Sequence, residues 1–226
     1  MHTITSFPKK ALPGQVPGLK TLLLLLGVSL LSGCLTFRQT LVFQKDSTCI
    51  ATYDYTLPRE YAPMLREGLR VLGELDGGAP LSLFLDEAAA TEYFTARGLE
   101  LRQYRQSQNG PDLQVQIIVL ARNVPQAMAS GAFGTLRLNK DVLGDWHLSG
   151  PLAALPEGLD QAELARWQKL CQGSSVSLAV TTPTAVIRSN GRNTAFNQVV
   201  WEYAWPASAE ASSLFQPAPA QVEVTW

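Results

Sequence analysis

The sequence predicts an α+β domain: an antiparallel sheet built from hairpins, with about three to four helices packed on one face. Three observations favour this fold class. Segments rich in β-branched and aromatic residues come in pairs separated by short turns. The helical periods between them are short, and no β-α-β unit carries a nucleotide-binding glycine loop. We also find no internal repeat.

The first hairpin is expected between Leu35–Phe43 and Thr48–Leu57, with Gln44–Ser47 as its turn. The second of these segments alternates, placing Cys49 and every second residue after it on one face. Pro58 suits the first turn of a helix, which apolar residues at helical spacing extend to about residue 75.

A second helix is expected to begin at Asp86, a good N-cap, and to end at Gly98. The strongest turn signal follows, Asn109-Gly110-Pro111-Asp112, between a polar strand and an apolar one. Asn123 is positioned to cap a short third helix. The strands that we expect around this turn are Leu99–Gln108 and Leu113–Ala121.

The last third of the chain predicts one more helix, Leu159–Leu170, among short strands. We expect the turn Ser189–Arg192 to join two of these strands into a hairpin, with Val222–Trp226 as an edge strand. The other strands are Thr135–Lys140, Asp145–Leu148, Ser175–Thr182, Ala185–Arg188 and Asn197–Trp205.

An export signal precedes this domain. The apolar run Leu22–Leu31 is shorter than the roughly 20 residues that span a bilayer, and three lysines but no acidic residue come before it. Leu31-Ser32-Gly33-Cys34 resembles the lipobox of bacterial lipoproteins. This resemblance implies a diacylglyceryl group on the Cys34 thiol and cleavage just before Cys34, so that acyl chains hold the protein on a membrane.

Three segments follow from this pattern: a signal peptide at residues 1–33, an α+β periplasmic domain at 34–205, and an Ala/Ser/Pro-rich tail at 206–226 that ends in the possible edge strand. The residue after Cys34 is Leu35 and not an aspartate. Among Gram-negative lipoproteins, this fits release to the periplasmic face of the outer membrane. In that oxidising compartment Cys49 and Cys171 are either a disulfide or two buried thiols, and the sequence leaves both open.

No catalytic constellation stands out. After removal of the signal peptide His147 is the one histidine, and no His/Cys cluster has zinc spacing. We expect no metal and no cofactor, and a net charge of −1 does not suggest a nucleic-acid partner. The favoured hypothesis is a non-enzymatic lipoprotein that binds lipid or an envelope protein. The alternatives are a surface-tethered hydrolase that uses His147, and a structural or assembly lipoprotein.

A second resemblance lies near the C-terminus. Thr182-Pro183-Thr184, Ser189-Asn190-Gly191 and Val199-Val200-Trp201 are similar to the ending of uncharacterised bacterial lipoproteins related to LppM. That resemblance implies a lipobox, an early hairpin and a role that involves envelope lipids. From the residues themselves, we expect Gly191 to supply a positive φ in the turn and Trp201 to fill the core beneath it.

Overall fold

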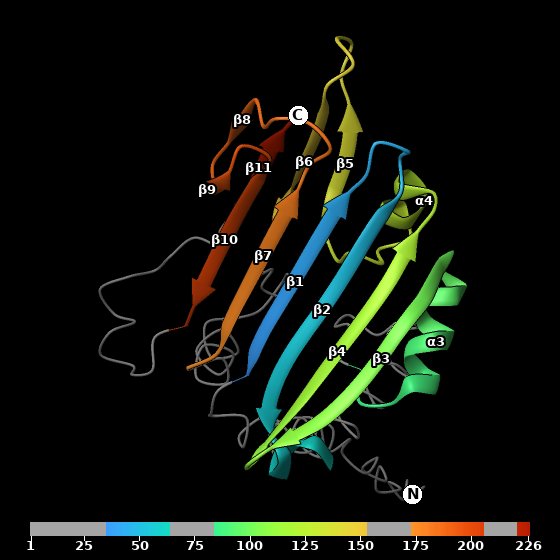
Figure 1. Ribbon diagram of the computed structural model, residues 1–226, viewed down its shortest axis with the longest axis vertical. Coiled ribbons are helices and arrows are strands. Elements are labelled where there is room, and N and C mark those ends of the chain that lie inside the picture. The colour runs from blue at the N-terminus through green and yellow to red at the C-terminus, as the bar shows by residue number, and fades with distance from the viewer. Residues whose placement is uncertain (1–34, 64–83, 153–172, 206–220) are drawn as a thin grey trace, which may run out of the picture.

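The computed structural model describes residues 35–63, 84–152, 173–205 and 221–226. Two sheets make up most of this part of the chain (Figure 1). The larger has seven strands in the order β3 (Leu99–Asn109), β4 (Asp112–Ala121), β2 (Cys49–Pro58), β1 (Thr36–Phe43), β7 (Ser175–Thr181), β10 (Gln198–Ala204) and β9 (Arg192–Ala195). The smaller has four, in the order β5 (Arg137–Lys140), β6 (Trp146–Pro151), β11 (Gln221–Thr225) and β8 (Arg188–Ser189).

The predicted fold class is wrong. The large sheet is mixed, because β1 pairs in parallel with β7, and a second sheet packs beside it where helices were expected. Within the described residues there are two α-helices, α3 (Glu87–Ala96) and α4 (Val124–Ala129), and one 3-10 turn, Arg59–Tyr61. The expected helices at 58–75 and 159–170 lie largely or wholly outside the described residues. Strands therefore dominate the architecture.

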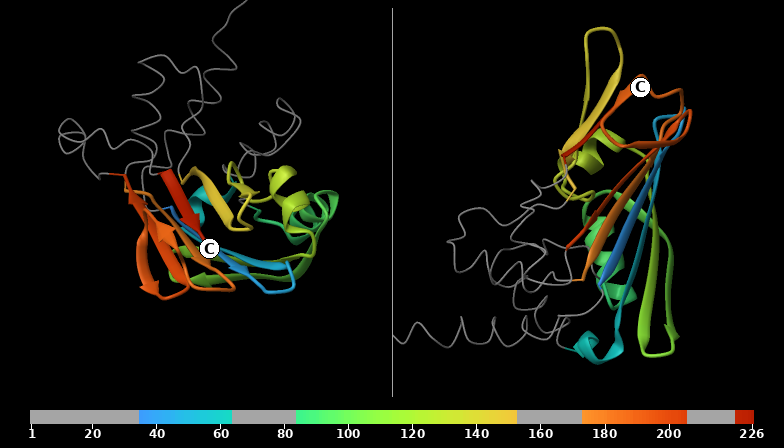
Figure 2. Two further views of the ribbon diagram at one scale, coloured as in Figure 1. Left: turned by 90° about the horizontal axis from the view of Figure 1, so that it is seen from above. Right: turned by 90° about the vertical axis from the view of Figure 1, so that its left-hand side faces the viewer.

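Both α-helices begin where the sequence placed their caps. The Asp86 side chain accepts a hydrogen bond from the backbone N–H of Ala89, and Asn123 accepts one from Gln126. Gly98, at φ +75°, then turns the chain from α3 into β3. The two helices and the second sheet lie on the same, concave face of the seven-stranded sheet (Figure 2).

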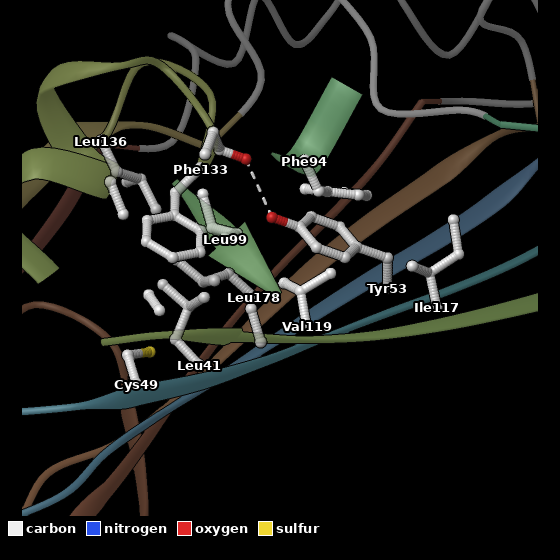
Figure 3. Packing of buried hydrophobic residues seen from close by; sticks show 14 of the residues in the cluster. Leu41, Cys49, Tyr53, Phe94, Leu99, Ile117, Val119, Phe133, Leu136 and Leu178 are labelled. Carbon is white, nitrogen blue, oxygen red and sulfur yellow. Dashed lines mark hydrogen bonds between the residues drawn. The ribbon is translucent and has the colours of Figure 1, made fainter. Parts of the chain in front are cut away.

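Alternating side chains build the core between these layers. β2 and β4 bury every second residue on the concave face, as period-two patterning requires. Tyr53 reaches across the core to donate its hydroxyl proton to the Ala132 carbonyl oxygen, 2.9 Å away (Figure 3). Tyr55 likewise bonds the Phe84 carbonyl. Burial raises the pKa of both phenols above the ordinary value, so both remain neutral donors.

The C-terminal hairpin does not form as predicted. β8 is only two residues long and pairs with β11 in the small sheet, while β9 pairs with β10 in the large one. The chain therefore crosses between the sheets at Asn190. Nor is the last strand an edge strand, because β11 lies between β6 and β8.

Gly191 is required for a different reason from the predicted one. The glycines with positive φ do not include it. A Cβ at this position would instead lie 2.5 Å from Val199 Cγ1 and 2.6 Å from Trp201 Cε2. The close approach of the Trp201 indole, which is 5% exposed, therefore excludes a side chain here.

The strands define two ends of the large sheet. We call the end at which β1 begins, at Thr36, the proximal end, and the end at which β1 finishes, at Phe43, the distal end. The eight residues of β1 span about 25 Å between them. The Trp226 ring packs at a tilt against Phe43, at 5.0 Å between ring centroids, so the end of β11 and the β5–β6 hairpin lie at the distal end (Figure 1).

Candidate functional site

The predicted lipidation site lies just before the described part of the chain. Cys34 and the residues expected to guide its processing, Leu31, Ser32 and Gly33, fall outside the described residues. Leu35 is the first residue described, and β1 begins at Thr36. Lipidation of Cys34 therefore stays a prediction. If it occurs, only one residue separates the acylated cysteine from a central strand of the large sheet.

Cys49, half of the predicted disulfide, is fully buried at the start of β2. Its Sγ approaches the Ile50 carbonyl oxygen at 3.7 Å, and burial raises the pKa of the thiol to about 12. Cys171 lies outside the described residues, so the pairing itself stays a prediction. The structure gives Cys49 the surroundings of a packed apolar residue.

His147 is the residue around which polar side chains gather. It lies on β6, and because the next residue, Leu148, is buried, the imidazole projects from the opposite, outer face of the small sheet. The strand register places Asn139 and Thr225 directly across from it, and Arg188 across from Thr225. All four residues therefore belong to one row on the outer face.

Two hydrogen bonds fix the imidazole. His147 Nε2 lies 2.9 Å from Asp141 Oδ2, and Nδ1 lies 2.9 Å from Thr225 Oγ1. We name these three side chains the His147 triad. The side chains of His147 and Asp141 are 41% and 31% exposed, so solvent reaches both.

Asp141 is itself held by the turn of the β5–β6 hairpin. Its Oδ1 accepts the backbone N–H groups of Leu143, at 2.8 Å, and Asp145, at 3.0 Å. The hydrogen bond with His147, followed by these backbone bonds, lowers the pKa of the Asp141 carboxyl below its ordinary value. The turn thus presents an ionised carboxylate to the imidazole at neutral pH.

A shallow hollow of about 340 Å³ opens beside the triad. His147 and Thr225 line it, together with Ser149, Glu223 and Arg188 from neighbouring strands, and Ile187. Hydroxyl, carboxylate, imidazole and guanidinium groups therefore surround one small space. This is the arrangement among the described residues that most resembles a reactive site.

A second hollow, of about 350 Å³, lies on the open face of the large sheet. Residues from the β1–β2 turn and from β2, β3 and β4 line it, including Asp46, Thr48, Arg102 and Arg122. Asp46 accepts hydrogen bonds from the hydroxyl and the backbone N–H of Thr48, which lower its pKa and complete the turn. Arg102 and Arg122 pair with Glu100, at 3.0 and 3.2 Å, so each of these polar groups has a partner within the protein.

Large apolar side chains are exposed at the distal end. Val142 and Leu143, in the tip of the β5–β6 hairpin, are 102% and 84% exposed. Ile187, just before β8, and Phe196, between β9 and β10, are 63% and 76% exposed. We name these four residues the distal apolar set; they are the large hydrophobic side chains exposed within the described ranges. On β10, Trp201 is buried, and Tyr203 packs against Trp205, just after the strand.

Sequence reasoning singled out His147 and missed its partners. Asp141 precedes it by six residues and is visible as a turn residue once the hairpin is assigned. Thr225 has no local signal, because the pairing of β6 with β11 joins distant parts of the chain. In the described ranges we find no group of three His, Cys, Asp or Glu side chains suited to a metal ion. No helix in those ranges has the length and apolarity of a transmembrane span.

No protein-family model and no curated protein sequence matches the chain. Among solved structures, it is similar to the folded domain of the Mycobacterium tuberculosis LppM protein, determined by NMR. The TM-score is 0.48 and the sequence identity is 14%, over 84% of this chain and 88% of that chain.

Proposed function

We propose that this protein is a lipoprotein of the bacterial envelope, anchored by acyl chains on Cys34, that presents its distal end to a protein partner. The lipobox supports the anchor. The start of β1 at Thr36 supports a short tether, because the proximal end of the large sheet then lies against the bilayer. With Leu35 after the cysteine, we assign the protein to the periplasmic face of the outer membrane.

One observation carries the partner-binding part of the proposal: the distal apolar set lies at the end of the sheet away from Cys34. The length of β1 puts this end about 25 Å from the anchor. The distal end therefore points away from the membrane surface and into the aqueous space. Exposed aliphatic and aromatic side chains at such a place are typical of interaction surfaces.

The charges beside the hairpin tip favour a protein over a second lipid surface. Lys140 is followed by Asp141 and Asp145, so the tip carries more acidic than basic groups. Anionic lipid attracts clusters of basic residues, which this tip lacks. We therefore commit to a protein whose own surface is apolar where it meets Leu143 and Phe196.

Photo-crosslinking in intact cells tests this proposal. A photoreactive amino acid replaces Leu143 or Phe196 at the distal end, and Ser107, an exposed residue of β3 near the proximal end, serves as the control. We expect the same protein to be crosslinked from both distal positions and not from Ser107. Its purified form should then bind Leu143→Asp at least ~10-fold more weakly than the wild type. Crosslinking to lipid, or equal crosslinking from all three positions, contradicts the proposal.

The anchor has its own test. Cys34→Ser should abolish incorporation of labelled palmitate and release the protein from the membrane fraction. Unchanged processing and fractionation would contradict the lipoprotein assignment. The crosslinking experiment tests partner binding at the distal end separately.

A tethered hydrolase is the second candidate function, and the His147 triad favours it. A carboxylate, an imidazole and a hydroxyl are joined in that order by two bonds of 2.9 Å, on a solvent-accessible face. The test is whether His147→Gln abolishes hydrolysis of a p-nitrophenyl ester by the purified full chain while its melting temperature stays unchanged.

A further inference from the structure

We propose that the Thr225 hydroxyl is the nucleophile of an acyl-transfer site, and that its substrates are short esters whose acyl part carries a carboxylate. This inference rests on the second candidate function, a hydrolase centred on His147. It names the attacking atom and the class of substrate, neither of which follows from the presence of the histidine alone.

The geometry at Thr225 satisfies the first requirement of a nucleophile. Its Oγ1 lies 2.9 Å from His147 Nδ1, which is within the range for proton transfer between a hydroxyl and a general base. The other ring nitrogen is held by Asp141, so a proton on Nε2 leaves Nδ1 free to accept the hydroxyl proton. Asp141 acts as a positioning residue, since the turn N–H groups fix its carboxylate.

The chemical step balances with these groups alone. Thr225 Oγ1 attacks the ester carbonyl carbon, and its proton passes to His147 Nδ1. As the tetrahedral intermediate collapses, the bond to the leaving-group oxygen breaks and that oxygen takes the proton from His147. The acyl group remains on Thr225 Oγ1. Water, deprotonated by the same nitrogen, then releases the carboxylic acid and restores the hydroxyl.

Arg188 and Ile187 define the substrate class. Arg188 is exposed and sits directly across from Thr225 on the same face, where its guanidinium can pair with a carboxylate or with the developing oxyanion. Ile187, 63% exposed, adds an apolar rim to the hollow. Glu223, two residues before Thr225 on that face, also lines the hollow and repels anions, so we place the substrate carboxylate at Arg188, on the strand beside Thr225. A volume of about 340 Å³ suits a short acyl chain.

The experiment uses the full chain in detergent micelles with p-nitrophenyl acetate and p-nitrophenyl hemisuccinate. We measure p-nitrophenolate release and identify the acylated residue by mass spectrometry of peptides from a rapidly quenched reaction. We expect one succinyl group on Thr225, and a loss of at least ~10²-fold in rate for both Thr225→Val and His147→Gln. Arg188→Gln should remove a preference of about threefold to fivefold for the hemisuccinate.

Two matched variants make the result decisive. Ser107→Ala removes an exposed hydroxyl of β3 near the proximal end, outside the hollow, and should leave the rate unchanged. Asp141→Asn should lower kcat and leave KM nearly unchanged, a split that a merely structural residue would not produce. Circular dichroism and thermal melting establish that each variant is folded, and the acylated peptide of the wild type gives the assignment independently of any variant.

The outcomes separate this inference from the function on which it rests. If His147→Gln loses activity while Thr225→Val keeps it, or if the acyl group is found on Ser149, the hydrolase stands and Thr225 is not its nucleophile. If the wild type hydrolyses neither ester and no acylated peptide appears, both the hydrolase and this inference are overturned.

Discussion

Asn190 and Trp201 join the two sheets. The indole Nε1 of Trp201, on β10 of the large sheet, donates to Asn190 Oδ1 at 2.7 Å. The same oxygen accepts the backbone N–H of Glu223, at 2.9 Å, and Asn190 Nδ2 donates to the Gln221 carbonyl at 2.8 Å, both from the small sheet. The Asn190 side-chain amide thus provides hydrogen-bond partners for the nearly buried indole N–H and for two backbone groups of β11.

Asn190→Ala should therefore destabilise the fold by about 1–3 kcal/mol, since it leaves the Trp201 N–H without its acceptor. Asn190→Asp keeps that acceptor but loses the donor to Gln221, so it should cost less. Chemical denaturation of both variants measures the difference. Asn193→Ala, which removes one exposed hydrogen bond to Ser189, is the control and should stay within ~0.5 kcal/mol of the wild type. Equal losses for Asn190→Ala and Asn193→Ala would contradict this role.

Gly191→Ala should cost about 1–3 kcal/mol, because the added methyl group overlaps Val199 and the Trp201 ring and forces one of them to move. The measurement is again the free energy of unfolding. Its neighbour Arg192 forms an exposed ion pair with Glu202 at 3.3 Å, and Arg192→Ala should change stability little. A Gly191→Ala protein as stable as the wild type would show that the indole has room to retreat.

Asp141 predicts a specific dependence of stability on pH. Its pKa is lower in the folded protein than its ordinary value of 3.8, first because of His147 and then because of the turn N–H groups. The ionised carboxylate therefore stabilises the fold above that value, and this contribution disappears as the pH falls through the lower, folded-state pKa.

Urea denaturation between pH 7 and pH 2 tests this dependence. The stability advantage of the wild type over Asp141→Asn should shrink as the pH falls below about 4, where the Asp141 carboxylate becomes protonated. A difference that is independent of pH would mean that the Asp141 carboxylate contributes nothing through its charge.

Cys49 should be chemically inert in the folded protein. Because its pKa is raised to about 12, little of the Cys49 thiol is ionised at pH 8. The side chain is also fully buried, so a reagent in solution does not reach it. Iodoacetamide should label it only after denaturation. The same experiment without reductant addresses the predicted disulfide with Cys171, because a bridged Cys49 would stay unlabelled even in denaturant. Rapid labelling of the native protein would contradict the buried position.

Local signals in the sequence located the strands and caps well. Alternation identified β2, and an apolar run identified β4. Asn109-Gly110-Pro111-Asp112 identified the β3–β4 turn, and Asp86 and Asn123 identified two helix starts. In each case the information lies within a few residues, where turn chemistry and side-chain period act directly.

The errors concern pairings between distant segments. No local sequence pattern around Thr36 or Ser175 predicts that β1 and β7 pair in parallel. Likewise, no pattern around Arg188 assigns β8 to the small sheet. The His147 triad was missed for the same reason, since Thr225 approaches His147 only after β11 inserts beside β6. The positive φ predicted for Gly191 is wrong; the requirement for glycine comes from the Trp201 ring, which packs against it from a distant strand.

The parallel pairing of β1 with β7 also bears on how the chain folds. Thr36 pairs with Ser175, so β1, in the middle of the large sheet, has one neighbour close in sequence, β2, and one more than 130 residues away, β7. Contacts of such large sequence separation carry a high loop-closure cost and slow the search for the native state. The β1–β7 pairing can form only after the chain has been made as far as β7, which begins at Ser175. If the chain is exported unfolded, as the proposed signal peptide implies, it can complete this pairing only after Ser175 has also crossed the membrane.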